Sequence, residues 1–183
     1  AKNLMSDDKH AQAQEFQRVT QQLAGAGAER VAITSFGGSF CADEFARISP
    51  LPMMDGPSAL VQHLQQAGLS RVGILGTTAV MSSKLYGKLD GVCECLSPAD
   101  EGEDAMQQCH DDYRELAFNG MATEGQRSRL FGAAQRLCER GAQTVILGGT
   151  DLNVIFDGSE PVPVVDSAEV HVQAIVAEAL RRG

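Results

Sequence analysis

The sequence contains no tryptophan, only two tyrosines and seven phenylalanines, so aromatic residues make up 5% of its 183 residues. It also lacks any apolar run close to the roughly 20 residues that a bilayer-spanning helix requires. Lys and Arg number 15 against 24 Asp and Glu, giving a formal net charge of -9. Surfaces for nucleic acid or anionic membranes need clustered cations, so we expect neither among the partners of this protein.

The five cysteines are odd in number and irregularly spaced, which does not fit a disulfide framework. Residues 1–8 lack the charged and apolar stretches of a secretory signal. These absences predict reduced thiols and a cytoplasmic location. The 43% of hydrophobic residues is sufficient for a full globular core.

Short apolar strands alternate with amphipathic helices along the chain. Glycine stops and caps delimit them, and Thr123 and Gln126 have the spacing of a capping box. Repeated strand and helix units predict an α/β fold with parallel, doubly wound sheets. We expect strands at 31–34, 72–75, 92–96, 144–148 and 162–165, and helices at 8–24, 40–48, 58–67, 81–89, 100–117, 123–140, 151–156 and 167–182.

The strand at 144–148 ends in two glycines, Gly148 and Gly149, which Thr150 and Asp151 follow. In open α/β sheets, small ligands bind outside the carboxyl ends of the strands, where backbone amides and short polar side chains converge. Segment 148–151 is therefore a candidate part of a ligand site.

The order of the elements and several motifs resemble the aspartate/glutamate racemase superfamily, the Asp/Glu/hydantoin racemases. Segment 75–81, Leu-Gly-Thr-Thr-Ala-Val-Met, followed by Tyr86, is similar to the family's glycine-threonine turn and helix. Thr123 with Gln126 and Arg127 resembles the capped helix of the second lobe, and segment 163–167 with His171 resembles the C-terminal strand and helix.

This resemblance covers nearly the whole chain and implies two pseudo-symmetric lobes with parallel, doubly wound sheets. Residues 1–70 and 162–183 would form lobe one, and residues 71–161 lobe two. Family members usually begin with a strand, a glycine-rich loop, a helix and a second strand, whereas Ala1 corresponds to the helix that follows them. We therefore expect an incomplete first lobe with open strand edges, and, since family members often pair, a homodimer.

Family chemistry uses two thiols on opposite sides of the α-carbon of an amino acid, without pyridoxal, metal or other cofactor. By the resemblance, the first thiol position falls at or next to Ser35 and the second at Gly149. Neither carries a thiol. A positioned acid or base contributes roughly 100-fold to 10,000-fold in rate, so the usual two-thiol racemisation should be lost.

Three other residues are candidate proton carriers. Cys41 should begin a helix, where the helix dipole lowers a thiol pKa, although a buried structural cysteine is the alternative. His171 resembles a family position near the site. His110 is either a site residue or an ordinary helix residue. The candidate catalytic set is therefore Ser35, Cys41, His110 and His171.

Ligand contacts are expected at the glycine-threonine turns, which hold substrate carboxylates in the family. By position these are Gly37, Gly38, Ser39, Thr77, Thr78, Gly149 and Thr150, together with Asp166 by the same resemblance. Turn and capping chemistry is the alternative for all of them. Asp151 replaces the glutamate usual in the family and has the same alternative as a helix cap.

Two cysteine-containing segments, 93–95 and 109–110, raise the alternative of a metal site. Their spacing lacks the two-residue gaps of most zinc sites, so we predict no metal. Two functions stay open. One is a cofactor-independent isomerase acting on an acidic amino acid or a related small carboxylate. The other is a catalytically inactive relative that binds such a ligand or has a structural or regulatory role.

Overall fold

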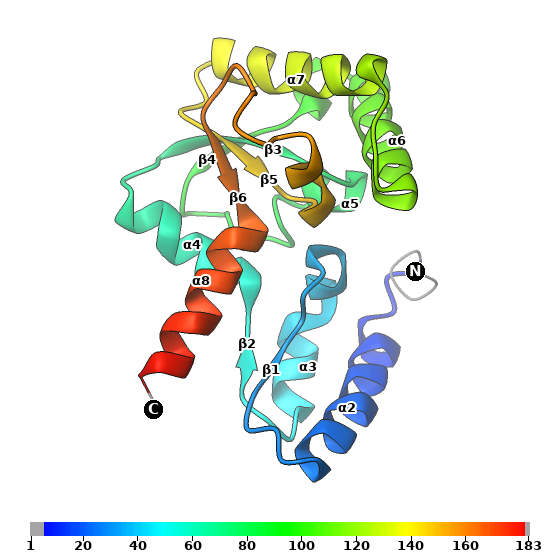
Figure 1. The fold of residues 1–183 in the computed structure, drawn as a ribbon, viewed down its shortest axis with the longest axis vertical. Helices are drawn as coiled ribbons and strands as arrows, with labels where there is room; N and C mark the ends of the chain where they lie inside the picture. Colours follow the sequence, from blue (N-terminus) through cyan, green and yellow to red (C-terminus); the bar gives the residue numbers. More distant parts are fainter. Residues whose placement is uncertain (1–5, 182–183) are drawn as a thin grey trace.

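The computed structural model describes residues 6–181, and it is an α/β protein with parallel sheets, as the sequence predicts (Figure 1). Its strands are β1 Val31–Ala32, β2 Met53–Met54, β3 Arg71–Leu75, β4 Glu94–Leu96, β5 Val145–Leu147 and β6 Val164–Asp166. Its α-helices are α2 Lys9–Gly25, α3 Ala42–Ile48, α4 Gly56–Gln66, α5 Thr78–Ser82, α6 Glu103–Asn119, α7 Glu124–Glu139 and α8 Ser167–Leu180. Three short 3-10 helices are η1 Phe36–Cys41, η2 Pro98–Glu101 and η3 Thr150–Val154.

The larger sheet has the strand order β4-β3-β5-β6, and all three pairings are parallel. Its register places Leu75 of β3 opposite Leu147 of β5, and Leu147 opposite Asp166 of β6. Because these strands end level with one another, the loops that follow β3 and β5 leave the sheet at the same edge.

The smaller sheet contains β1 and β2, paired in parallel with Val31 opposite Met53. β1 is shorter than the expected strand at 31–34 because Thr34 and Ser35 are exposed and lead into η1. The sequence groups residues 162–183 with this lobe, but β6 pairs with β5 in the larger sheet. The division into lobes at these residues stays a prediction.

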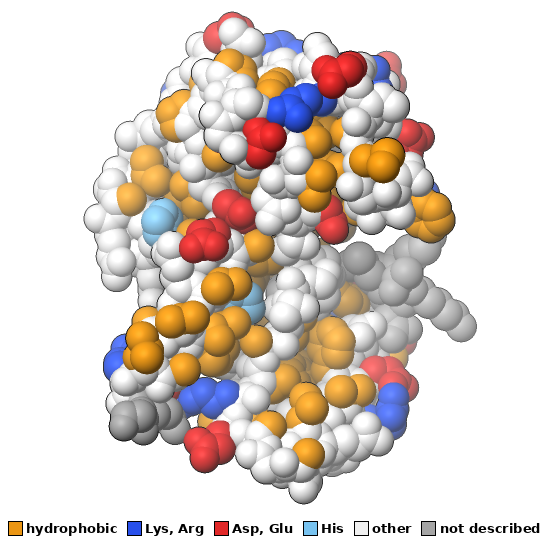
Figure 2. Space-filling view, viewed as in Figure 1, with side chains coloured by type: hydrophobic (Ala, Val, Ile, Leu, Met, Phe, Trp, Pro, Cys, Tyr) orange, Lys and Arg blue, Asp and Glu red, His pale blue; other side chains and the backbone are white. Residues whose placement is uncertain are grey.

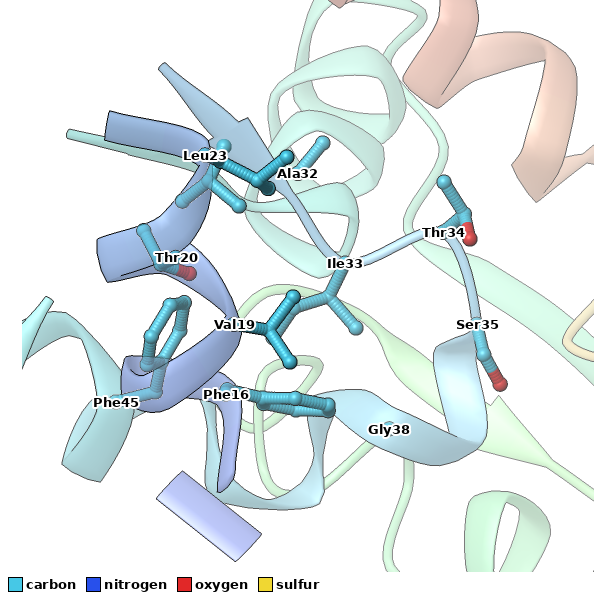
Figure 3. Close-up of a pocket in the computed structure, with 11 residues that line it drawn as sticks. Phe16, Val19, Thr20, Leu23, Ala32, Ile33, Thr34, Ser35, Gly38 and Phe45 are labelled. Atoms are coloured by element: carbon cyan, nitrogen blue, oxygen red, sulfur yellow. The ribbon is translucent and has the colours of Figure 1, made fainter. Parts of the chain in front are cut away.

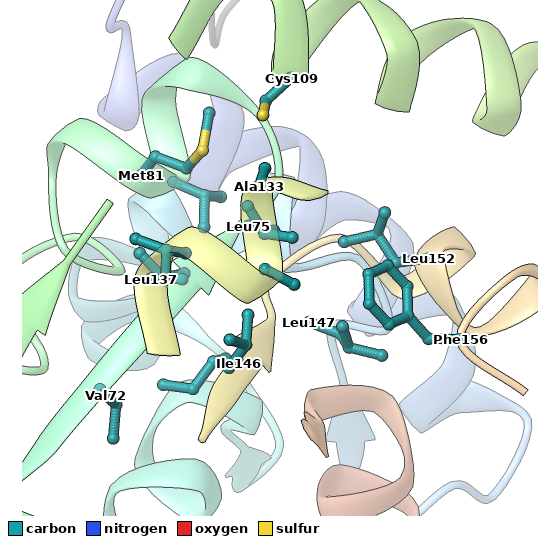
Figure 4. Packing of buried hydrophobic residues seen from close by; sticks show 14 of the residues in the cluster. Val72, Leu75, Met81, Cys109, Ala133, Leu137, Ile146, Leu147, Leu152 and Phe156 are labelled. Atoms are coloured by element: carbon teal, nitrogen blue, oxygen red, sulfur yellow. The ribbon is translucent and has the colours of Figure 1, made fainter. Parts of the chain in front are cut away.

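The main core lies around the larger sheet, where α7 packs against β3 and β5 (Figure 4). Leu137 of α7 lies directly over Gly73 of β3, since a Cβ on Gly73 would be 3.0 Å from its Cδ1. The side chains of β3 and β5 alternate between the two faces of the sheet and are buried and aliphatic on both, as expected for parallel strands covered on both faces. They include Val72, Ile74, Leu75, Val145, Ile146 and Leu147.

The helix expected at 81–89 is wrong for most of its length, since the observed helix α5 is Thr78–Ser82. α5 ends at Ser82, and Lys84, Leu85 and Tyr86 have φ values of 48°, 57° and 57° in the left-handed region. The Tyr86 N–H donates to Ser83 Oγ at 2.9 Å, which supports this turn. The turn brings Leu85 and Leu89 into the core, where both are fully buried, so burial outweighs helix propensity here.

Some apolar side chains remain exposed beside the smaller sheet. Figure 2 shows hydrophobic side chains gathered over α8, and this helix exposes Val172, Val176 and Leu180. No helix within residues 6–181 has both the length and the apolar character needed to cross a membrane.

Candidate functional site

The loops after β3 and β5 lie in contact at the carboxyl edge of the larger sheet. The Gly148 N–H donates to the Leu75 carbonyl oxygen at 2.7 Å. A Cβ on Gly76, whose φ is 159°, would lie 3.1 Å from the Gly148 carbonyl carbon. Glycine at position 76 therefore allows the backbone after β3 to approach the backbone after β5 closely. Thr77 and Gly149 are the next residues along these two loops.

Thr77 and Thr78 begin α5, and their polar groups already have partners. Thr77 Oγ1 accepts from the Val80 N–H at 3.3 Å as an N-cap. The Thr78 N–H donates to Nδ1 of His110, on α6, at 3.0 Å. A ligand that used the Thr78 amide would have to displace the His110 ring.

His110 is an intermediate-exposure residue whose pKa is lowered, first by burial and then by the positive charge of Arg114. Because its Nδ1 accepts a hydrogen bond, the neutral tautomer carries its proton on Nε2. His110 is therefore a neutral imidazole that accepts a hydrogen bond from an N-terminal amide of α5. The structure thus brings two predicted residues, Thr78 and His110, into contact.

The His110 contact predicts a pH dependence of stability. The pKa of His110 is lower in the folded state than in the unfolded chain, where it should be near the ordinary histidine value of 6.5. Stability should therefore decrease as the pH falls below about 6.5 through the lowered pKa. His110→Gln, whose side-chain oxygen still accepts from Thr78, should reduce this slope in urea unfolding measured between pH 5 and 8. An unchanged slope would contradict the assignment.

Tyr113, one turn after His110 on α6, fills the space beside Gly149. A Cβ built on Gly149 would lie 2.4 Å from Cε2 and Cζ of Tyr113 and 2.8 Å from its hydroxyl oxygen. The hydroxyl donates to Oδ2 of Asp151 at 3.1 Å. Burial, and next the negative charge of Asp151, raise the pKa of Tyr113 far above its ordinary range. The phenol is therefore neutral and occupies the place of a side chain at position 149.

The sequence analysis did not select Tyr113 as a site residue. Its stripe with Cys109 and Leu116 indicates a core position, and it is only 9% exposed. A usable signal was its spacing of three residues from His110, which places both side chains on one face of a helix. Only the packing of α6 onto the loop after β5 shows that this face covers the sheet edge.

After β1, η1 holds four of the predicted residues. Ser35 precedes η1 and is exposed, and its side chain makes no capping hydrogen bond. Ser39 is buried, and its hydroxyl donates to the Ser35 carbonyl oxygen at 3.5 Å. The Gly37 carbonyl oxygen accepts from the Tyr86 hydroxyl at 3.5 Å, so the turn after α5 contacts η1. Gly38 packs against Ile33 and Phe16.

Cys41 is fully buried at the end of η1. Burial raises the pKa of its thiol to about 11, and its Sγ lies 3.6 Å from the Gly38 carbonyl oxygen, to which the thiol donates. The lowering expected from a helix start is therefore outweighed by desolvation. The thiol remains protonated near neutral pH.

His171 and Asp166 lie at the start of α8. His171 is 4% exposed, its Nε2–H donates to the Met54 carbonyl oxygen at 3.1 Å, and its ring meets Phe36 edge-on. Asp166 accepts from the Ala168 N–H at 2.8 Å as the N-cap of α8. His171 thus joins α8 to the residues around β2, and Asp166 caps the N-terminus of α8 itself.

Two pockets adjoin η1. One, of about 330 Å³, lies between α2 and β1 and is mainly apolar. Figure 3 shows Phe16, Val19 and Leu23 facing Ala32 and Ile33, with Ser35 at the far end from α2. The other, of about 450 Å³, is lined by Ser39, Tyr86 and neighbours from α3 and α5. Neither of these pockets reaches Thr77 or Thr150.

The predicted residues therefore form three groups. Thr77, Thr78, His110, Gly149 and Thr150 lie around the carboxyl edge of the larger sheet, together with Asp151 and with Tyr113, which the structure adds. The η1 residues approach this edge through the Tyr86 contact. Asp166 ends β6 opposite Leu147 at the same edge, whereas His171 contacts the Met54 carbonyl beside the smaller sheet. Across residues 6–181, no three His, Cys, Asp or Glu side chains come together to hold a metal ion.

A family profile described as Asp/Glu/Hydantoin racemase matches residues 3–175 of the sequence. This chain belongs to the Asp/Glu/hydantoin racemase family. Solved structures agree at the level of the fold. A Yersinia pestis protein assigned as an Asp/Glu racemase superposes with a TM-score of 0.80 and 23% identity, covering 98% of this chain and 78% of the other.

Two further structures show the same fold. An aspartate racemase homologue from Pyrococcus horikoshii OT3 has a TM-score of 0.76 and 24% identity over 91% of this chain and 74% of its own. The glutamate racemase from Francisella tularensis, in complex with D-glutamate, has a TM-score of 0.69 and 16% identity. That match covers 94% of this chain and 65% of the other.

Family membership gives the Gly149 contact its significance. The resemblance assigns a thiol to position 149, and this racemase-family chain has a tyrosine ring there instead. Its five cysteines are all free, and the two that are buried, Cys41 and Cys109, both have a thiol pKa raised to about 11 by burial. Neither buried thiol can form a thiolate readily near neutral pH.

Proposed function

We propose that this chain binds a small carboxylate of the acidic amino-acid type at the carboxyl edge of its larger sheet, without two-thiol racemisation. One observation carries the proposal: the Tyr113 phenol lies within 2.4 Å of where a Cβ of residue 149 would be. Gly149 has no side chain that could donate or accept a proton, and the Tyr113 ring leaves no space for one at this position.

The other position to which the resemblance assigns a thiol supports the same conclusion. Ser35 is a serine, whose hydroxyl is far too weak an acid to form a base near neutral pH without a neighbouring base. It has no side-chain hydrogen bond to a histidine or carboxylate within residues 6–181. Cys41 is buried with a thiol pKa of about 11, so it does not supply the missing thiolate.

Ligand binding is supported by the edge itself and by the fold neighbours. The loops after β3 and β5 meet at Gly76 and Gly148, and Thr77 and Thr150 follow this contact in the two loops. The carboxyl edge of a parallel sheet is where such folds bind small molecules. A glutamate racemase of the same fold has been solved with D-glutamate, which favours a small amino dicarboxylate here.

An isomerase is the second candidate, and family membership favours it. Such an enzyme would need proton carriers other than the two thiols. The titratable side chains at the edge are His110 and Tyr113, and both have pKa values shifted towards the neutral form by burial. In this candidate, His110 is the base and Tyr113 the acid.

The two candidates differ in the exchange of the α-proton. We expect calorimetry to detect binding of aspartate or glutamate, while proton NMR in D₂O detects no enzyme-dependent loss of the α-proton signal. Each absent acid or base removes roughly 100-fold to 10,000-fold in rate, so two absences should place exchange at background. Enzyme-dependent deuteration of either amino acid would overturn the proposal in favour of the isomerase.

The position of the ligand is tested with Thr150→Val, which keeps the side-chain shape and removes the hydroxyl. We expect about a tenfold loss of affinity, the cost of one hydrogen bond to a charged ligand. Ser128→Ala, on the exposed surface of α7, is the control and should bind as the unmodified protein does. Equal affinities for all three proteins would place the ligand elsewhere.

A further inference from the structure

The outer face of α6 has the composition of a protein–protein interface. Phe118, near the end of this helix, is 91% exposed, the highest value among the large apolar side chains that the structure describes. Met121, in the loop that follows, is 69% exposed, and Arg114 lies exposed one turn before Phe118. Aromatic residues, methionine and arginine are the residue types enriched at such interfaces. Figure 1 shows α6 at the outer margin of the molecule, where a partner can reach it.

Arg114 and Phe118 lie on the same face of α6 because they are four residues apart. Within residues 6–181, Arg114 forms no hydrogen bond or ion pair, and the Phe118 ring has no aromatic or cationic partner. The same spacing on α7 gives a different result, since Cζ of Arg127 lies 5.1 Å from the centroid of the Phe131 ring. An open hollow of about 830 Å³ runs along α6, and all of its lining residues belong to this one helix. The opposite wall must therefore come from another molecule.

We propose that a second copy of this chain packs antiparallel on this face of α6, about a twofold axis level with Leu116. In that arrangement Arg114 of each copy lies opposite Phe118 of the other. A twofold interface uses the same patch on both subunits, so the contact forms twice. Each guanidinium then lies over an aromatic face, which is a favourable cation–π contact. This inference is independent of the ligand at the sheet edge.

The charges of α6 are compatible with this pairing. Each chain has a formal net charge of -9, so two copies repel each other unless the carboxylates at their contact are kept apart. In the proposed register Asp111 lies opposite Met121 of the second copy, and Glu115 lies opposite Ala117. Both carboxylates already accept a hydrogen bond from a glutamine of their own chain. The pairing therefore places no carboxylate directly opposite another.

Sedimentation velocity over a range of protein concentrations tests the proposal. We expect a reversible dimer, and Phe118→Ser should raise its Kd by about 30-fold or more, the usual effect of removing a central interface side chain. Arg114→Ala should raise the Kd by about 10-fold, because each dimer loses two cation–π contacts. In the Phe118→Ser background, Arg114→Ala should have no further effect. Phe118→Tyr retains the ring and should retain the dimer.

Leu180→Ser is the matched control, since Leu180 is an exposed apolar residue at the end of α8, the other helix with an exposed apolar face. It should leave the Kd unchanged. Persistence of the dimer in Phe118→Ser, or an equal or larger loss in Leu180→Ser, would overturn the proposal, as would a protein that is monomeric at every soluble concentration. A further loss from Arg114→Ala in the Phe118→Ser background would contradict the contact between Arg114 and Phe118.

Discussion

Gly149→Ala is expected to destabilise the protein by about 2 kcal/mol, the cost of overpacking a filled site. The added Cβ would lie 2.4 Å from two ring atoms of Tyr113, which is 9% exposed and packed in the core. The ring or the loop after β5 must therefore move, and the bond from Tyr113 to Asp151 is strained or lost. Urea unfolding at neutral pH measures the change in the free energy of unfolding.

A double-mutant cycle identifies the cause. Tyr113→Leu removes the distal ring atoms that contact position 149, so Gly149→Ala should cost less than about 0.5 kcal/mol in that background. Gly148→Ala is the matched control. A Cβ there would meet Val80 at 2.8 Å and the Leu75 carbonyl oxygen at 2.9 Å, so Tyr113→Leu should not relieve it. Equal costs of Gly149→Ala in both backgrounds would show that Tyr113 does not fill this space.

His171→Ala is expected to reduce the free energy of unfolding by about 3 kcal/mol, because we assign His171 a structural role. The substitution empties a buried site next to Phe36 and Gly56 and leaves the Met54 carbonyl without its donor. Since this contact joins α8 to the residues around β2, the loss should appear as a lower midpoint in urea.

His63→Ala is the control for this substitution. His63 lies on α4, beside the groove between α4 and α8, and should change stability by less than about 0.5 kcal/mol. His171→Gln retains a donor for Met54 and should recover part of the loss. If His171→Ala kept its stability but lost ligand binding, His171 would belong to the ligand site.

Caps and stops were predictable because they depend on neighbours along the chain. The capping box of Thr123 and Gln126 is present with both reciprocal bonds, and α4 ends near Gly68 as the pattern indicates. The strands at the centre of the larger sheet, β3 and β5, were also placed well, since burial on both faces leaves a continuous hydrophobic run. The turn at Lys84 to Tyr86 was not predictable, because tertiary burial of Leu85 and Leu89 determines it.

The candidate site was only partly predictable for the same reason. Thr77 and Gly149 are visible in the sequence as strand-end residues, and the register of β3 and β5 brings their loops together. The raised pKa of Cys41 depends on packing around η1, which no local pattern encodes. The approach of His110 to Thr78 depends on how α6 crosses the sheet edge.

By itself, the sequence determined the α/β class, the family resemblance and the absence of thiols at positions 35 and 149, because these depend on residue order and local periodicity. Only the tertiary structure decided that β6 joins the larger sheet and that the Tyr113 ring fills the space beside Gly149. The physical reason is that such contacts join residues distant in the chain, and their geometry depends on the packing of whole helices and strands.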